Sequence, residues 1–222
     1  LIVEKHVGKI GEAKTTLPPS SIALGHTRWA THGGVTDINA HPHLDCTGQI
    51  AVIHNGIVEN YRDLKNILQK KGHRFKSETD SEVISHFIEE EAKNKDWPAA
   101  VFSAFQQLIG SNAIGVLINP SKTIICCRNG SPLVVGLGQK EYFIVSDVTA
   151  ILSKTKKVLY LDDGEGVVLS EKGVKLFNLA TQKEKSYQPQ TVDIKVEAAE
   201  KGKFSHYLLK EIYEQKQLPY KI

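Results

Sequence analysis

The chain has 222 residues, of which 41% are hydrophobic, and its lysines and arginines exceed its acidic residues by only three charges. Such a chain can bury a substantial core as one large domain or two small ones. Its basic residues are scattered along the sequence, and its apolar runs are far too short to cross a bilayer. We therefore expect a globular protein that binds neither nucleic acid nor a membrane.

The three cysteines do not suit a disulfide framework. Cys126 and Cys127 are adjacent in a β-branched run, so their side chains would point to opposite faces of a strand. Unpaired cysteines are typical of proteins in a reducing compartment. We therefore expect a cytoplasmic protein.

Apolar periodicity predicts strands along most of the chain and helices mainly in one block. Residues 1–3 are predicted as a strand fragment, and the Thr-, Pro- and Ser-rich stretch up to Ser21 as a loop after a short helical or turn segment. The further predicted strands are 21–24, 50–53, 113–118, 123–127, 133–136, 142–146, 158–161, 166–169 and 174–178. The predicted helices are 60–70, 81–93, 97–108, a short one at 148–152 and an amphipathic one at 204–215.

This order of elements indicates an α+β layered fold, because many antiparallel strand signals occur with segregated helices. Asp80 is predicted as the N-cap of the helix at 81–93, which would place its carboxylate at a helix start. From about Asp193 the sequence becomes more charged and then enters a fresh amphipathic pattern. We expect one domain at 1–192, with a linker and the start of a second domain at 193–222.

Asn55 and Gly56 follow the apolar run 50–53, a pattern that usually predicts a tight β-hairpin. The residues that come next have the 3-to-4 spacing of an amphipathic helix, and no returning strand follows. A type I′ turn at this pair is therefore the weaker interpretation, and a functional role is the stronger one.

Histidines are concentrated in the window from residue 26 to residue 54, which holds five of the nine. They are His26, His32, His41, His43 and His54. A metal site built from His41, His43 and Cys46 is one interpretation. Their spacing matches neither the paired ligands of structural zinc sites nor the helical ligand pair of catalytic ones. We therefore predict no metal site.

The segment GHTRWATHGG favours recognition of a small zwitterion. Arg28 offers a planar fork that matches a carboxylate, with Thr31 and His32 as further donors on a glycine-terminated loop. Trp29 is placed to cover the ligand as a lid. The alternative, a surface arginine paired with an acid and a tryptophan that caps the core, stays open on these residues alone.

Six motifs occur in a fixed order, namely GHTRWATHGG, NAHPH, HNGIVEN, SETDSEVI, RNGSPLVVGLG and KEIYEQ. In this order they resemble the glutaminase domain of the glucosamine-6-phosphate synthases, also called glutamine–fructose-6-phosphate aminotransferases. That family belongs to the N-terminal-nucleophile, or class II, glutamine amidotransferases. The resemblance runs from about Gly8 to Gln215, which is nearly the whole chain.

The resemblance implies the four-layer αββα sandwich of the N-terminal-nucleophile hydrolases. It also implies an activity, which is release of ammonia from L-glutamine for transfer to fructose-6-phosphate to give glucosamine-6-phosphate. Fructose-6-phosphate would bind in a sugar isomerase domain that begins near Phe204. The family needs no cofactor for this chemistry, and the full protein is expected to be a homodimer.

The resemblance assigns catalytic roles to Asn55 and Gly56. The side-chain amide of Asn55 and the backbone N–H of Gly56 would form the oxyanion hole for the tetrahedral intermediate. Gly56 would also allow close approach of the substrate, because it has no Cβ. His41 matches a histidine near the pocket, and a purely structural hydrogen bond to the loop is an equal alternative for it.

Substrate-binding roles follow from the same comparison. Arg28 would bind the α-carboxylate of glutamine, with Thr31 and His32 close by, and Asp80 would bind its α-amino group. Opposite charges at the two ends of one small ligand fix its orientation. Trp29 resembles the residue of a mobile loop that closes over the site.

The nucleophile of the family is an N-terminal cysteine activated by its own α-amine. Here the chain begins with Leu1 and contains no methionine. We therefore expect that a first segment bearing this cysteine lies ahead of Leu1 and is lacking here. As written, the chain would bind glutamine without hydrolysing it.

Three other functions stay open. One is a non-catalytic amino-acid-binding module that retains Arg28 and Asp80. Another is a metal-dependent hydrolase built on the histidines. The last is the glutaminase domain of a different class II amidotransferase.

Overall fold

The structure is a computed structural model that describes residues 1–8, 15–193 and 202–215. It contains two compact units. The first comprises Leu1–Leu133 and Tyr160–Gln188, and the second comprises Val134–Leu159 and the described part of Pro189–Ile222. The short helical or turn segment expected before Ser21 falls partly on 9–14, outside the described residues.

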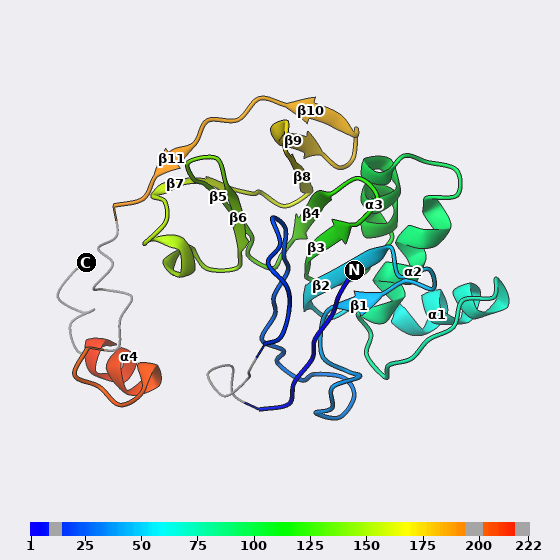
Figure 1. Cartoon of the computed structure of the whole chain (residues 1–222), viewed down its shortest axis with the longest axis horizontal. Helices are drawn as coiled ribbons and strands as arrows, with labels where there is room; N and C mark the ends of the chain where they lie inside the picture. Colours follow the sequence, from blue (N-terminus) through cyan, green and yellow to red (C-terminus); the bar gives the residue numbers. More distant parts are fainter. Residues whose placement is uncertain (9–14, 194–201, 216–222) are drawn as a thin grey trace. The chain divides into compact units, whose positions relative to one another are not determined.

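A seven-stranded antiparallel sheet forms the centre of the first unit (Figure 1), with strand order β1-β2-β3-β4-β8-β9-β10. Its strands are β1 His43–Leu44, β2 Ile50–Gly56, β3 Asn112–Ile118, β4 Thr123–Asn129, β8 Glu165–Ser170, β9 Gly173–Asn178 and β10 Lys183–Lys185. The helices α1 Tyr61–Lys70, α2 Glu82–Glu91 and α3 Trp97–Gln106 lie between β2 and β3 in the chain.

These three helices form one layer on the sheet, since α2 contacts β1 and β2, α3 contacts β4, and α2 packs against both other helices. Ile84 and Ile88 of α2 and Phe102 of α3 are at most 1% exposed and share one core cluster with Val52 and Val116 of the sheet. Burial of such side chains is the main favourable term in folding. The core therefore fixes the sheet against its helical layer.

The second unit contains a four-stranded sheet with the order β11-β7-β5-β6. Its elements are β5 Val134–Leu137, β6 Tyr142–Val145, the 3₁₀ helix η2 Val148–Ile151, β7 Lys157–Tyr160, β11 Gln190–Thr191 and α4 Tyr207–Gln215. A small core packs inside it, made of Val134, Ile151, Leu152, Val158 and Val192. Among the described residues, no helix is long and apolar enough to cross a membrane.

The predicted α+β class is confirmed, as are most of the predicted elements. The strand predictions at 1–3 and 21–24 are wrong, because these described residues have no strand partner. The short strands β1, β10 and β11 were not predicted. Two or three residues carry too little periodicity to be recognised, and only their pairing with a longer neighbour defines them.

Strand β2 runs three residues further than predicted, through the Asn-Gly pair. It pairs with β3, in the register Asn55 to Ala113 and Gly56 to Asn112, and therefore forms no hairpin at this point. Gly56 has φ +134°, and a Cβ at this position would lie 2.0 Å from the carbonyl oxygen of Ser111. Only glycine fits here, because the backbones approach so closely.

Asp80 lies at the start of α2, but it is not the helix cap. The N-cap is Ser81, which makes no side-chain capping bond. The Asp80 carboxylate instead accepts the backbone N–H of Val58 at 2.8 Å. The Asp80 carboxylate, which the sequence predicted to cap α2, thus accepts a backbone N–H from the segment after β2 instead.

We expect Phe102→Ala to lower the free energy of unfolding by about 3–5 kcal/mol, because it empties a fully buried ring site. Urea denaturation measures this loss. Ile67→Ala, at a residue of α1 that is 53% exposed, is the control and should cost less than about 1 kcal/mol. Equal losses in the two variants would contradict the assigned core.

Candidate active site

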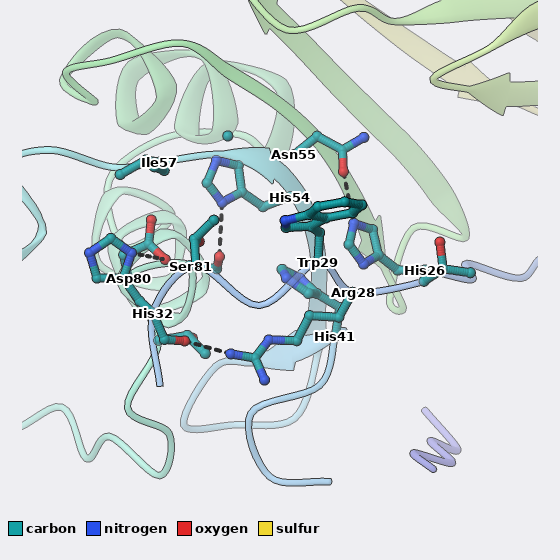
Figure 2. A pocket seen from close by; sticks show the side chains of 14 residues that line it. His26, Arg28, Trp29, His32, His41, His54, Asn55, Ile57, Asp80 and Ser81 are labelled. Carbon is teal, nitrogen blue, oxygen red and sulfur yellow. Dashed lines mark hydrogen bonds and ion pairs between the residues drawn. The ribbon is translucent and has the colours of Figure 1, made fainter. Parts of the chain in front are cut away.

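A pocket with a cavity of about 300 Å³ opens in the first unit, within the range of small-molecule sites (Figure 2). Most of its lining comes from three parts of the chain. These are the loop at 26–32, the end of β2 and the residues that follow it at 54–57, and residues 79–81 before α2. All eight predicted site residues line it, namely Arg28, Trp29, Thr31, His32, His41, Asn55, Gly56 and Asp80.

The side chain of Asn55 is held in one orientation by His26. The two side chains meet at 2.9 Å between His26 Nε2 and Asn55 Oδ1 (Figure 2). Because a carbonyl oxygen only accepts, the imidazole must donate its Nε2–H. The Nδ2 amide hydrogens of Asn55 are then the donors that this residue can offer to a ligand. His26 was not predicted as a site residue.

His54 fixes the end of β2 from inside the protein. It is 3% exposed, and its Nε2 donates to Asn112 Oδ1 at 2.9 Å. Its Nδ1 then accepts from the hydroxyl of Ser81 at 2.8 Å. Burial lowers the pKa of His54, so the ring stays neutral. Sequence reasoning missed this role, although a histidine inside an apolar strand was a signal for it.

Asp80 places a buried carboxylate at the pocket. It is 3% exposed, and Oδ2 is occupied by the Val58 N–H. Oδ1 lies 3.9 Å from Nδ1 of His32, which comes from the loop (Figure 2). A buried carboxylate is costly unless cationic or hydrogen-bonding groups face it, which suits a ligand ammonium group at this position.

Arg28 holds its own loop together. Its guanidinium donates to the carbonyl oxygen of Gly34 at 2.7 Å, to that of Gly33 at 3.1 Å, and to that of His32. These bonds fix the guanidinium at the pocket. Trp29 next to it is 89% exposed although it lines the pocket, so its indole lies at the mouth.

The loop is anchored to the segment before α2 through Asn39. This residue is fully buried, and its Nδ2 donates to Gly34 O and to Glu78 Oε2, both at 3.1 Å. The backbone N–H of Glu78 donates to Asn39 Oδ1 at 3.0 Å. The Arg28 loop and Asp80 are thereby positioned against each other. Asn39, which sits in the NAHPH motif, was not predicted to have this role.

The proposed ligand set of His41, His43 and Cys46 is not assembled. The ring of His41 lies 4.2 Å from that of His26 and 4.8 Å from that of His43. His43 Nε2 lies 3.1 Å from Thr79 Oγ1. The sulfur of Cys46 lies beside His86, at 3.4 Å from Nδ1.

No cysteine is among the described residues that line the pocket. Cys126 and Cys127 lie in β4, a strand as predicted, and are fully buried. Cys46 is in the turn before β2. None of the three thiols is therefore placed to react with a ligand in this pocket.

A family model described as a glutamine amidotransferase domain matches residues 26–153, which is more than half of the chain. This chain belongs to the glutamine amidotransferase domain family. The match contains every residue of the pocket. The amidotransferase assignment predicted from the six motifs is confirmed.

Curated relatives of this amidotransferase domain carry the name glutamine–fructose-6-phosphate aminotransferase (isomerizing). The protein of Thermus thermophilus is 47% identical over 220 residues, covering 97% of this chain and 36% of the relative. The protein of Pyrococcus horikoshii is 42% identical over 222 residues, covering 97% of this chain and 37% of the relative. The chain thus spans about a third of the length of these relatives.

Solved structures agree with the fold. The glutamine phosphoribosylpyrophosphate amidotransferase of B. subtilis, complexed with ADP and GMP, superimposes with a TM-score of 0.60 at 24% identity. The match covers 69% of this chain and 34% of that one. It shows that this amidotransferase domain has the α+β fold of the N-terminal-nucleophile hydrolases.

Buried histidines make the stability of this fold depend on pH. Burial lowers the pKa of His43 from an ordinary 6.5 to about 4 and that of His41 to about 2. Below pH 6.5 the unfolded chain takes up protons at these rings and the folded chain does not. We expect the free energy of unfolding to fall by up to about 1.4 kcal/mol per pH unit for each ring as the pH drops from 6.5 to 4.

Urea denaturation at several pH values between 7 and 4 measures this slope. His43→Gln should make it shallower, because one neutral buried imidazole is removed. His206→Gln, at an exposed histidine, is the control and should leave the slope unchanged. A slope that does not respond to His43→Gln would contradict the assigned burial of a neutral ring.

Proposed function

We propose that this chain is the glutamine-hydrolysing part of a glutamine–fructose-6-phosphate aminotransferase. In this proposal it releases ammonia from L-glutamine, and the ammonia is transferred to fructose-6-phosphate to give glucosamine-6-phosphate. One observation carries the proposal. The pocket brings together a buried carboxylate, a guanidinium and an oriented amide donor, contributed by Asp80, Arg28 and Asn55. The names of the relatives support the choice of acceptor.

Recognition of glutamine uses its two charged groups. The α-ammonium group binds at Oδ1 of Asp80, since Oδ2 is occupied by the Val58 N–H. The α-carboxylate binds at the loop that carries Arg28, Thr31 and His32. Charge-assisted hydrogen bonds at both ends favour α-amino acids over amides that lack these groups.

The chemistry takes place at the end of β2. A cysteine thiolate attacks the side-chain amide carbon of glutamine, and the carbonyl oxygen becomes an oxyanion. Asn55 Nδ2 and the Gly56 N–H donate to this oxygen, so they stabilise charge that develops only in the transition state. Ammonia leaves with a proton from the general base, and water then hydrolyses the thioester to give glutamate.

The attacking thiolate is that of an N-terminal cysteine with its own α-amine as general base. This assignment is supported by the family resemblance and by the pocket, whose described lining residues include no thiol. Trp29, exposed at the mouth, closes over bound glutamine and limits access of water. His41 supports the pocket through its packing against His26.

The proposal extends to the whole protein. Residues 1–192 belong to the glutaminase domain, and 193–222 are a linker and the start of the sugar isomerase domain that binds fructose-6-phosphate. Residues 194–201 and 216–222 of that region lie outside the described residues. The full protein works as a homodimer in the cytoplasm.

In the full protein, Asn55→Ala should lower kcat for glutamine hydrolysis by about 100-fold or more, with a smaller change in KM, because the lost donor acts on the oxyanion. Ammonia release measures both constants. Asn94→Ala, at an exposed residue after α2, is the matched control and should behave as wild type. Wild-type kcat in Asn55→Ala would remove this residue from the oxyanion hole. Glutamine binding by the wild-type protein without ammonia release would indicate a non-catalytic binding module.

Arg28→Lys should raise the KM for glutamine by about 10-fold or more, because an ammonium group cannot reproduce the donor geometry of the guanidinium. Arg74→Lys, at an exposed residue outside the pocket, is the control for the same exchange. An unchanged KM in Arg28→Lys would show that the α-carboxylate binds elsewhere.

A further inference from the structure

A second polar cluster lies outside the pocket, and the proposed glutaminase chemistry does not use it. Its four members each place one ligand-type atom within 4.8 Å of the others. They are Cys46, His73, His86 and Glu89. We propose that these four side chains form a structural Zn²⁺ site. The sequence analysis considered only His41, His43 and Cys46 as ligands. It did not find the present set, in which Cys46 lies 27 residues from His73 and 40 from His86.

Four of the six distances between the ligand atoms lie near tetrahedral values, and all six are within 4.8 Å. Ligands at about 2.0–2.3 Å from zinc lie about 3.3–3.6 Å from one another. Here Cys46 Sγ lies 3.4 Å from His86 Nδ1 and 3.8 Å from His73 Nδ1. Glu89 Oε2 lies 3.1 Å from His73 Nδ1 and 3.5 Å from His86 Nδ1. Small shifts of the side chains bring all four atoms into one coordination sphere.

Supporting groups orient the two imidazoles as metal sites require. Both ring nitrogens of His73 face a carboxylate, Nε2 at 3.1 Å from Glu90 Oε2 and Nδ1 at 3.1 Å from Glu89 Oε2. With a metal bound at Nδ1, the ring would keep its proton on Nε2 and donate it to Glu90. The Nε2 of His86 faces Glu82 Oε1 at 3.6 Å. A carboxylate behind a ligating histidine fixes its tautomer and raises its basicity. Both rings are buried, with side-chain exposures of 3% and 2%.

The sulfur of Cys46 is also prepared for coordination. The backbone N–H of Arg74 donates to it at 3.4 Å, a contact that stabilises a thiolate. Coordination replaces the thiol proton, which passes to the buffer.

The donor set selects the metal. One sulfur, two imidazole nitrogens and one carboxylate oxygen suit Zn²⁺, whereas Mg²⁺ and Ca²⁺ prefer oxygen ligands alone. Four protein ligands complete the tetrahedron and leave no position for a substrate, so the site is structural. It would join the turn before β2, the chain after α1 and the helix α2, which supports the strand that carries Asn55 at its other end.

Metal content and the cobalt spectrum test this inference. The full protein, purified with zinc in the medium and passed through a desalting column, should retain about one zinc per chain. Replacement by Co²⁺ should give the visible bands of a tetrahedral site and a near-ultraviolet thiolate-to-cobalt charge-transfer band. Cys46→Ser, in an exposed turn, should lose the charge-transfer band. Glu89→Gln should weaken metal retention, and Glu91→Gln, on the same helix, is the matched control that should not.

Thermal unfolding gives a second readout that does not depend on glutaminase activity. Zinc at about 100 times its dissociation constant should raise Tm by about 5–10 °C in the wild type. The rise should be absent in Cys46→Ser and preserved in Glu91→Gln. Absence of retained zinc together with an unchanged Tm in the wild type would overturn the proposal. Equal zinc retention by Cys46→Ser and the wild type would overturn it as well.

Discussion

The site depends on one buried imidazole. His54 donates to Asn112 at the start of β3 and accepts from Ser81 at the start of α2. Breaking either bond would leave a buried polar atom without a partner, at a cost of about 1–3 kcal/mol. Asn55 follows His54 in the chain and Asp80 precedes Ser81, so this ring sets the distance between the Asn55 amide and the Asp80 carboxylate.

The Arg28 loop is positioned by a second polar link. The loop itself is largely exposed and packs little apolar surface, so hydrogen bonds must define its place. The buried amide of Asn39 joins it to Glu78, two residues before Asp80. A guanidinium and a carboxylate of opposite charge thereby face one pocket from separate segments. Trp29 remains exposed at the mouth, which leaves it able to move over a ligand.

Helices and strands with a regular spacing of apolar residues could be predicted from the sequence. Helices α2 and α3 and strands β3 and β4 have long, regular apolar patterns, and all four were predicted. The eight pocket residues were found because their motifs resemble those of a known family, although nothing in their spacing shows that they meet.

Long-range polar contacts could not be predicted. The Asp80 carboxylate could accept an N–H from the start of α2 or from Val58. In the structure it accepts the N–H of Val58, which is more distant in sequence. Pairing of Asn39 with Glu78 joins residues that are 39 positions apart. Cys46 meets His73 and His86 for the same reason, since the fold brings a turn, the end of α1 and a helix face together. Such contacts follow from tertiary packing and leave no local pattern in the sequence.

The proposed specificity depends most on recognition of the ligand's α-ammonium group by Asp80. Calorimetry can test this contact with two ligands, L-glutamate and glutarate, which lacks the amino group. Each ligand is titrated into the full wild-type protein and into its Asp80→Asn variant, and the four affinities give the coupling between Asp80 and the amine. Asn keeps an acceptor for Val58 and removes only the charge, so the fold should persist. We expect that glutarate binds the wild type about 10-fold or more weakly than L-glutamate does, and that this difference is much smaller in the variant. The coupling energy between Asp80 and the amine should be about 1.5 kcal/mol or more. Additive losses, with no coupling between residue and amine, would contradict it.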